Sequence, residues 1–277
     1  MLKIDSHHHF WKYDAVEYGW IGESMRTLRR DFLPAHLHRA LDEGGIEQAI
    51  SVQARQTLQE TDWLLELAAK DSRIAAVVGW VPLASAQLDP ALQALASQPK
   101  LKAVRHVLQD EPANQLMDHA DFNRGIARLH HYGLRYDLLI FERHLSQAIA
   151  FVDRHPNQIF ILDHVAKPNI AKHVMEPWRT KIGELAKRQN VYCKISGMVT
   201  ESEWANWKTT DLTPYLDTVL QAFGPARLMY GSDWPVMLVA SSYGRWSKLI
   251  GAYLSRLSEA EQTRIWGATA KEAYQIP

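Results

Sequence analysis

Three consecutive histidines end the first apolar stretch of the chain, and two of them are spaced as paired catalytic or metal-binding imidazoles are. The segment LKIDSHHHFW spans residues 2–11. In a β-strand the side chains alternate between two faces, so His7 and His9 share one face and His8 takes the other. Two such imidazoles at the end of a buried strand can converge on one cation or one substrate oxygen. We interpret them as site residues rather than as a tag fragment, because a tag would be longer and would not be embedded in an apolar run.

Further polar side chains follow later apolar runs of the chain. These are Arg105 and His106, Asp137, Asp163 and His164, Lys194 and Ser196, and Ser232 and Asp233. Each has a structural explanation when taken alone, such as a hydrogen-bonded core histidine, a buried ion-pair partner or a cap. If these strands end at the same edge of one sheet or barrel, so many titratable groups are not expected to gather there by chance. Together they predict an active site at that edge.

Asp5 is predicted to lie on the same strand face as His7, one step deeper. Two roles are open for its carboxylate at this point. It is expected either to orient an imidazole as a hydrogen-bond acceptor or to form an ion pair with Lys3 or Arg105.

Eight strand-then-helix units are predicted to position these groups. The strands are expected at about residues 2–9, 47–54, 74–83, 101–108, 134–141, 159–165, 191–195 and 227–230. Near-continuous apolar runs such as 74–83 are typical of parallel strands buried on both faces. No linker divides the units, so we predict an α/β protein with a single domain over residues 1–277, a (β/α)8 TIM barrel with its site at the carboxyl ends of the strands. The competing open sheet would show a glycine-rich phosphate turn after its first strand, where this chain has histidines.

A long loop is predicted after the first strand, at about residues 12–34. It lacks clear periodicity and is expected to form a wall or lid of the site. Three indoles border strand ends and are expected to stack on a sugar-like ring, with core packing as the alternative for at least one of them: Trp11, Trp80 and Trp234.

The bulk composition argues against several classes of partner. The 277 residues are 47% hydrophobic and carry a formal net charge of +0, which predicts a packed core and no nucleic-acid or membrane partner. The single cysteine, Cys193, is expected to be a buried inert thiol and excludes a disulfide framework within the chain, so a cytoplasmic location is expected. No signal peptide or membrane span is expected. Composition does not predict the oligomeric state.

The motifs IDSHHHFW, KAVRH, DHVAKP, KISG and YGSDWP occur in the order of the predicted strands, and with them the chain resembles the amidohydrolase superfamily. More narrowly it resembles the sugar-lactone hydrolase branch of L-fuconolactonase-like and L-rhamnonolactonase-like proteins. Two-metal members carry a carboxylated lysine and a histidine where this chain has Arg105-His106 and Tyr136-Asp137. The resemblance therefore implies one divalent ion, zinc above others, with these ligands: His7, His9, His164 and Asp233. Because the branch includes enzymes without a metal, the need for the ion stays open.

The resemblance also implies an activity, namely the opening of an aldonolactone such as L-fucono- or L-rhamnono-lactone to the sugar acid. Asp233 would act as general base, while the three site imidazoles and Arg105 would stabilise the carbonyl oxygen. The expected substrate-binding residues are Arg105, His106, Trp11, Trp80, Trp234 and Ser196. Two alternatives remain: a metal-dependent amidohydrolase or decarboxylase acting on another small carbonyl compound, and a sugar-acid-binding protein without catalysis.

Overall fold

Eight parallel strands form one barrel in the computed structural model, which describes residues 1–111 and 116–277. The strands are β1 (Ile4–His8), β2 (Gln48–Val52), β3 (Ile74–Gly79), β4 (Leu101–His106), β5 (Arg135–Leu138), β6 (Phe160–Leu162), β7 (Val191–Ile195) and β8 (Leu228–Tyr230). Each pairs in parallel with the next along the chain. The ring closes just beyond β8, where the backbone N–H of His9 donates to Trp234 O at 2.7 Å and that of Asp233 donates to His7 O at 2.8 Å. The predicted (β/α)8 barrel is confirmed.

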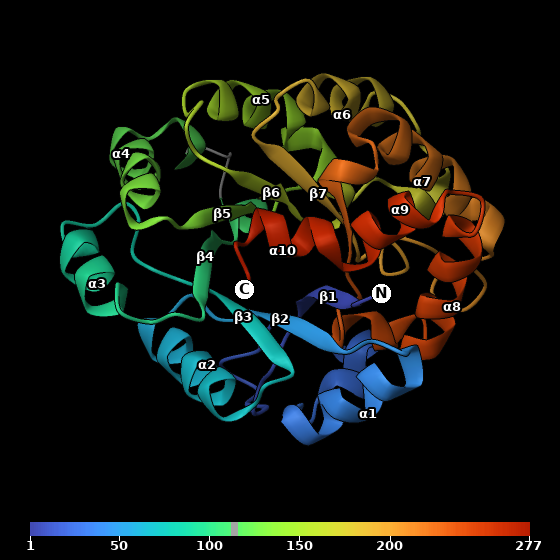
Figure 1. Ribbon diagram of the computed structural model, residues 1–277, viewed down its shortest axis with the longest axis horizontal. Helices are drawn as coiled ribbons and strands as arrows, with labels where there is room; N and C mark the ends of the chain where they lie inside the picture. The colour runs from blue at the N-terminus through green and yellow to red at the C-terminus, as the bar shows by residue number, and fades with distance from the viewer. Residues whose placement is uncertain (112–115) are drawn as a thin grey trace.

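Helices surround the barrel on its outside, except that α10 lies across one end of it (Figure 1). They are α1 (Pro34–Gly44), α2 (Leu58–Lys70), α3 (Leu88–Leu95), α4 (Ala120–Leu129), α5 (Leu145–Asp153), α6 (Trp178–Ala186), α7 (Thr209–Phe223), α8 (Tyr243–Leu254), α9 (Glu259–Thr263) and α10 (Thr269–Ala273). Local chemistry sets their ends. The α1 helix ends at Gly45, which takes the left-handed conformation at φ 65°, and Ser258 caps α9 together with Glu261.

Two apolar layers account for the burial of the strands on both faces. An outer layer packs the strands against the helices. The inner layer fills the barrel with small and branched side chains from most of the strands, among them Ile50, Val78, Ala103 and Ile161. Ala270, Ala273 and Tyr274 belong to this inner layer, so α10 and the residue after it cover the end of the barrel at which the strands begin (Figure 1).

Strand β1 contains an irregularity that overturns the predicted position of Asp5. The register shifts between Asp5, which pairs with Ala49, and His8, which pairs with Ser51. The extra residue reverses the alternation, so that Ile4 lies in the inner layer while Asp5 faces α8 and accepts a hydrogen bond from the hydroxyl of Tyr243 at 2.8 Å. Asp5 therefore does not share a face with His7, and the two predicted roles are wrong: it neither orients an imidazole nor pairs with a cation.

The segment after β1 has more internal structure than a simple loop. Trp11 and Phe32 form an antiparallel bridge at its base, and the Trp11 indole N–H donates to Arg30 O at 2.9 Å. Between them lies the 3₁₀ helix η1 (Glu23–Leu28). These contacts close residues 12–31 into a unit held at both ends.

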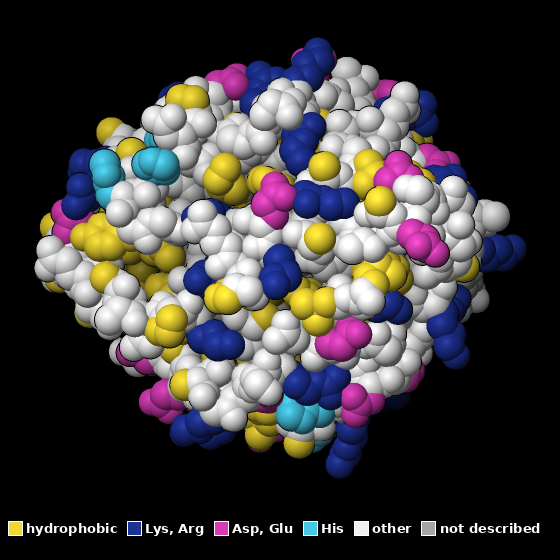
Figure 2. Space-filling model, in the orientation of Figure 1, with side chains coloured by type: hydrophobic (Ala, Val, Ile, Leu, Met, Phe, Trp, Pro, Cys, Tyr) yellow, Lys and Arg dark blue, Asp and Glu magenta, His cyan; other side chains and the backbone are white. Residues whose placement is uncertain are grey.

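The surface at the α10 side of the molecule mixes both signs of charge with apolar and neutral side chains (Figure 2). Among the described residues no helix has both the length and the apolar character required for crossing a bilayer.

Candidate functional site

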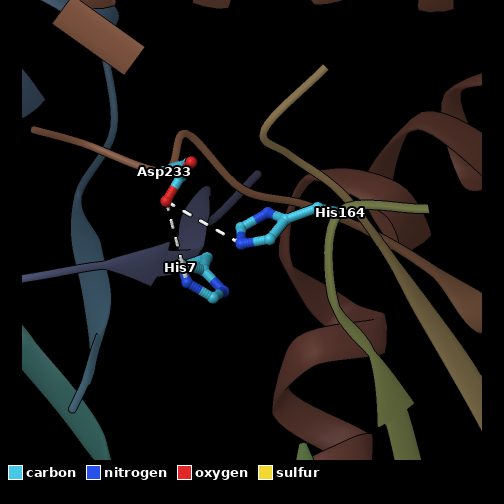
Figure 3. Close-up of side chains that lie close together, drawn as sticks. All are labelled: His7, His164 and Asp233. Atoms are coloured by element: carbon cyan, nitrogen blue, oxygen red, sulfur yellow. Dashed lines mark ion pairs between the residues drawn. The ribbon is translucent and has the colours of Figure 1, made fainter. Parts of the chain in front are cut away.

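Side chains from three distant parts of the chain meet at the carboxyl end of the barrel. Oδ1 of Asp233 lies 3.9 Å from Nε2 of His7 and 3.8 Å from Nε2 of His164, and all three side chains point toward one another (Figure 3). His7 comes from β1, His164 follows β6 and Asp233 follows β8. The closed barrel brings the three together because the carboxyl ends of its strands share one rim.

His9 completes this group as the sequence predicted it. Its Nε2 lies 3.2 Å from Nε2 of His7 and 3.5 Å from Oδ1 of Asp233. Its Nδ1 lies 2.8 Å from Val52 O, which places the proton on Nδ1 and turns Nε2 toward the site.

Three of the four predicted ligands, His7, His164 and Asp233, form a group that can hold a single divalent ion, and His9 lies next to it. Tetrahedral ligands at about 2.0–2.1 Å from zinc are separated by about 3.4 Å, and the distances from Asp233 to the three imidazoles and from His7 to His9 run from 3.2 to 3.9 Å. His7, His164 and Asp233 alone already keep their ligand atoms within 4.8 Å of one another. The cluster can therefore hold a metal.

The backbone around His164 is folded in a way that the strand pattern does not predict. Strand β6 ends at Leu162 rather than at Val165, and residues 164–167 all have positive φ, between 48° and 61°. This left-handed turn presents His164 to the site. Gly197 makes room for the ring, because a Cβ atom at this position would lie 2.6 Å from Nδ1 of His164.

Asp233 is held by its own backbone and by Asp5. Its φ is 63°, and the residue before it is fixed by the buried Asp5 carboxylate, which accepts from the Ser232 N–H at 2.8 Å and from its hydroxyl at 2.5 Å. These hydrogen bonds lower the pKa of Asp5, but burial raises it by more, so that the pKa is about 6. The role of Asp5 is thus to anchor the loop that carries Asp233.

The electrostatics keep the Asp233 carboxylate ionised, which is the form that a general base requires. Burial acts to raise the pKa of its carboxyl, but the charge of His164, the hydrogen bond and charge of His9 and the charge of Lys167 outweigh burial, so the pKa is lowered. Burial lowers the pKa of His164 to about 4 and that of His7 well below its usual value. The site therefore combines an ionised Asp233 carboxylate with neutral His7 and His164 rings near neutral pH.

Arg105 supplies a fixed positive charge beside the imidazoles. Its Nη1 lies 3.0 Å from Oδ2 of Asp163 and 3.3 Å from Nε2 of His7, and its Nη2 donates to Gln53 O at 2.5 Å. The guanidinium is nearly buried and still lines the cavity described next. It can donate to a carbonyl oxygen that enters from that cavity.

A cavity of about 690 Å³ opens above this group. His9, Arg105, His164 and Asp233 line its floor, and the segment after β1 contributes wall residues that include Trp20. Side chains without a role in the sequence-based prediction complete the wall: Trp20, Trp204, Lys167 and Glu201. Lys167 lies in the motif DHVAKP and could have been found from it. The indoles of Trp20 and Trp204 lie in loops, whose positions in the fold are not predicted by hydrophobic periodicity.

Five residues predicted to contact substrate lie outside the cavity lining. Trp11 and Trp234 pack around Phe32 in the outer core. The indole N–H of Trp80 donates to Nδ1 of His106 at 3.3 Å. The other ring nitrogen of His106 pairs with Glu111 at 2.8 Å. The hydroxyl of Ser196 lies 2.8 Å from Nδ1 of His164, so it acts on an imidazole instead of facing the cavity.

Comparison with known proteins identifies the family of this chain. Residues 4–276 match the amidohydrolase family. The chain belongs to the amidohydrolase family. Among members of this family, it is 44% identical over 287 residues to an L-fucono-1,5-lactonase of Burkholderia multivorans, covering 100% of this chain and 97% of that protein.

Two further comparisons concern amidohydrolase relatives of full length. An L-fucono-1,5-lactonase of Burkholderia ambifaria is 34% identical over 279 residues, covering 99% of this chain and 96% of that protein. A crystal structure of an amidohydrolase from Burkholderia multivorans with bound zinc superposes with a TM-score of 0.95 at 44% identity, covering 100% of both chains. The resemblance to the sugar-lactone branch is confirmed by these relatives.

Proposed function

We propose that this amidohydrolase opens an aldonolactone of the L-fucono-1,5-lactone type to the free sugar acid. The observation that carries the proposal is the 44% identity of this chain, over its full length, to a lactonase of that name. The position of Asp233 in the cavity lining supports it. This likeness supports hydrolysis over decarboxylation and over binding without turnover.

Asp233 acts as the base in the proposed reaction. Its contacts with the three imidazoles all use Oδ1, which leaves Oδ2 available to take a proton from water as the water oxygen bonds to the lactone carbonyl carbon. When the ring C–O bond breaks, the same proton passes to the departing alkoxide. The product hydroxy acid then ionises and releases acid to the solution.

The developing charge on the carbonyl oxygen is stabilised by Arg105 and the neighbouring imidazoles. Removing one such donor typically costs about 3 kcal/mol, or roughly a hundredfold in rate. A zinc ion held by His7, His164 and Asp233, with His9 beside them, would keep a coordination position open, where it would polarise the carbonyl or lower the pKa of the attacking water.

The cavity walls suit a small polyhydroxylated ring. Trp20 and Trp204 offer indole faces for its apolar side, and Lys167 and Glu201 offer charged partners for its hydroxyl groups. The proposed substrate contacts are therefore these four side chains together with Arg105.

Acid release in a pH-stat from L-fucono-1,5-lactone and a panel of aldonolactones tests the proposal. We expect release well above the spontaneous rate, which is measured without enzyme and subtracted. The panel is run on protein treated with chelator, on untreated protein and on protein with added zinc, so that the metal requirement is measured separately. No release above background from any lactone in all three states would contradict the proposal.

A further inference from the structure

Two oppositely charged side chains in the cavity wall lack polar partners of their own. Lys167 ends the left-handed turn after β6, Glu201 lies in the loop after β7, and both line the cavity. Within residues 1–111 and 116–277, neither head group makes a hydrogen bond or an ion pair. The Lys167 ammonium lies 5.4 Å from the centre of the Phe141 ring, a contact that leaves N–H donors for a ligand.

The backbone fixes the two side chains in neighbouring positions. The N–H of Ala171, four residues after Lys167, donates to Glu201 O at 2.9 Å, which joins the loop after β6 to the loop after β7. Burial raises the pKa of Glu201, and the charge of Lys167 acts to lower it. The two head groups are therefore close enough to interact through their charges, although they form no ion pair.

An aromatic ring lies beside the carboxylate in the same loop. Trp204 lines the cavity, and its indole N–H donates to Thr200 O at 2.8 Å, which fixes the ring. Because the indole N–H is already used, Trp204 offers a ligand only its apolar surface. Hydrogen bonding at this part of the wall is therefore left to Glu201 and Lys167.

The chemistry of the two charges indicates which ligand group fits between them. An anionic group would suit Lys167 but would be repelled by Glu201, and a cationic group would be repelled by Lys167. A hydroxyl is neutral, donates one hydrogen and accepts through its lone pairs, so that a single hydroxyl can satisfy the ammonium and the carboxylate together. Such charge-assisted hydrogen bonds are the stronger ones.

We propose that Lys167 and Glu201 together recognise one ring hydroxyl of the lactone, with Lys167 donating to its oxygen and Glu201 accepting its hydrogen. This inference rests on the proposed lactonase function and deepens it, because it makes the enzyme selective for lactones that carry this hydroxyl. The corresponding deoxy lactone would leave both charges without a partner and would be bound poorly for that reason.

Affinities for a stable analogue test the proposal. The probe is the 1,5-lactam of L-fuconic acid, in which N–H replaces the ring oxygen, together with its 2-deoxy, 3-deoxy and 4-deoxy forms. Calorimetry measures their binding to the wild type, to Glu201→Gln and to Lys167→Met. We expect each variant to bind the fully hydroxylated lactam roughly ten- to a hundredfold more weakly, which is the effect of losing a hydrogen bond to a charged group.

The deoxy lactams identify the hydroxyl that the two residues share. For one of them, and the same one for both variants, we expect the wild type and the variant to bind within about twofold of each other, because the group that they contact is gone. Glu203→Gln and Lys172→Met are the matched controls. Both change exposed side chains in the same two segments, and both should bind every lactam as the wild type does.

Three outcomes would overturn the proposal: a wild type that binds no lactam, variants that bind the full lactam as tightly as the wild type, and variants whose effects disappear on different deoxy lactams or on none. Calorimetry with the lactam requires no turnover. A wild type that binds the lactam as expected but releases no acid from any lactone would therefore count against the proposed hydrolysis and not against the recognition of the hydroxyl.

Discussion

The hydroxyl of Ser196 lies 2.8 Å from Nδ1 of His164, while Nε2 of the same ring lies 3.8 Å from Oδ1 of Asp233. The serine thus contacts the ring nitrogen on the side of the imidazole that faces away from Asp233. Ser196→Ala removes this contact without removing a cavity residue, and we expect kcat to fall by about tenfold or more, as is typical when a site histidine loses its indirect partner. Steady-state kinetics on the lactone measures the effect. Ser202→Ala is the control, because the buried hydroxyl of Ser202 donates within its own turn, to Val199 O at 2.6 Å, and reaches no site residue in the described part of the chain.

Asp233→Asn removes the proposed base and keeps the size of the side chain. We expect turnover to fall by a factor of about 10² or more, because an amide cannot take the proton from water. Asp62→Asn, an exposed carboxylate on α2, should keep wild-type turnover in the same assay. The assignment of Asp233 is lost if Asp233→Asn retains more than about a tenth of the wild-type rate.

Gly197→Ala tests the space behind His164. The added methyl group would lie 2.6 Å from Nδ1 of the ring, at a backbone φ of 64°. We expect a loss of roughly 1–2 kcal/mol of unfolding free energy from the left-handed conformation, and a loss of activity of tenfold or more because the ring is displaced.

Gly183→Ala provides the opposite case for comparison. This glycine lies inside α6 with nothing within 4 Å of an added Cβ, so the substitution should raise stability by about 0.5–1 kcal/mol and leave kcat unchanged. Urea unfolding and kinetics on both variants make the comparison. Equal behaviour of the two glycine variants would show that the clash with His164 is absent.

His155 predicts a pH dependence of stability. Burial, and then the charge of Arg154, lower its pKa to about 4, whereas the unfolded chain titrates near 6.5. The unfolded state therefore binds the proton first, and this contribution to stability is fully present above pH 6.5 and is lost as the pH falls toward 4. His155→Gln should lose less stability than the wild type between pH 6.5 and pH 4 in urea unfolding. His131→Gln, an exposed histidine, should follow the wild-type profile. A wild-type pH slope in His155→Gln would contradict the assignment.

The sequence predicts the barrel well because each strand is an apolar run closed by polar residues. The strand at 191–195 is predicted at its exact limits. The four residues of the imidazole and carboxylate group are among the polar residues predicted at the strand ends, and the resemblance to the amidohydrolase superfamily selects them from that larger set. Local irregularities are not encoded in this way. The shift in β1 that turns Asp5 outward arises from pairing with Ala49 and Ser51, and such a shift is invisible in an alternation pattern.

The cavity walls are predicted less well than its floor. An indole next to a strand end, such as Trp11, is chemically as suitable for stacking as Trp20, which lies in the same segment. Trp11 is held in the core by its bridge with Phe32, whereas Trp20 lines the cavity. The bridge joins residues that no periodicity in the sequence links. For the same reason the contact of Tyr274 with Asp137, 137 residues apart in the chain, leaves no signal in the local sequence.

The left-handed turn at residues 164–167 has a consequence for how this protein can change. None of its four residues is glycine. Each therefore lowers the stability of the folded state by on the order of 1–2 kcal/mol through a backbone conformation that glycine adopts freely. A laboratory selection for heat resistance alone should therefore enrich glycine at Ala166, where the change removes only one methyl group. Such variants would be more stable to heat, but the turn that orients His164 would be more flexible. Thermal stability would therefore rise while kcat fell.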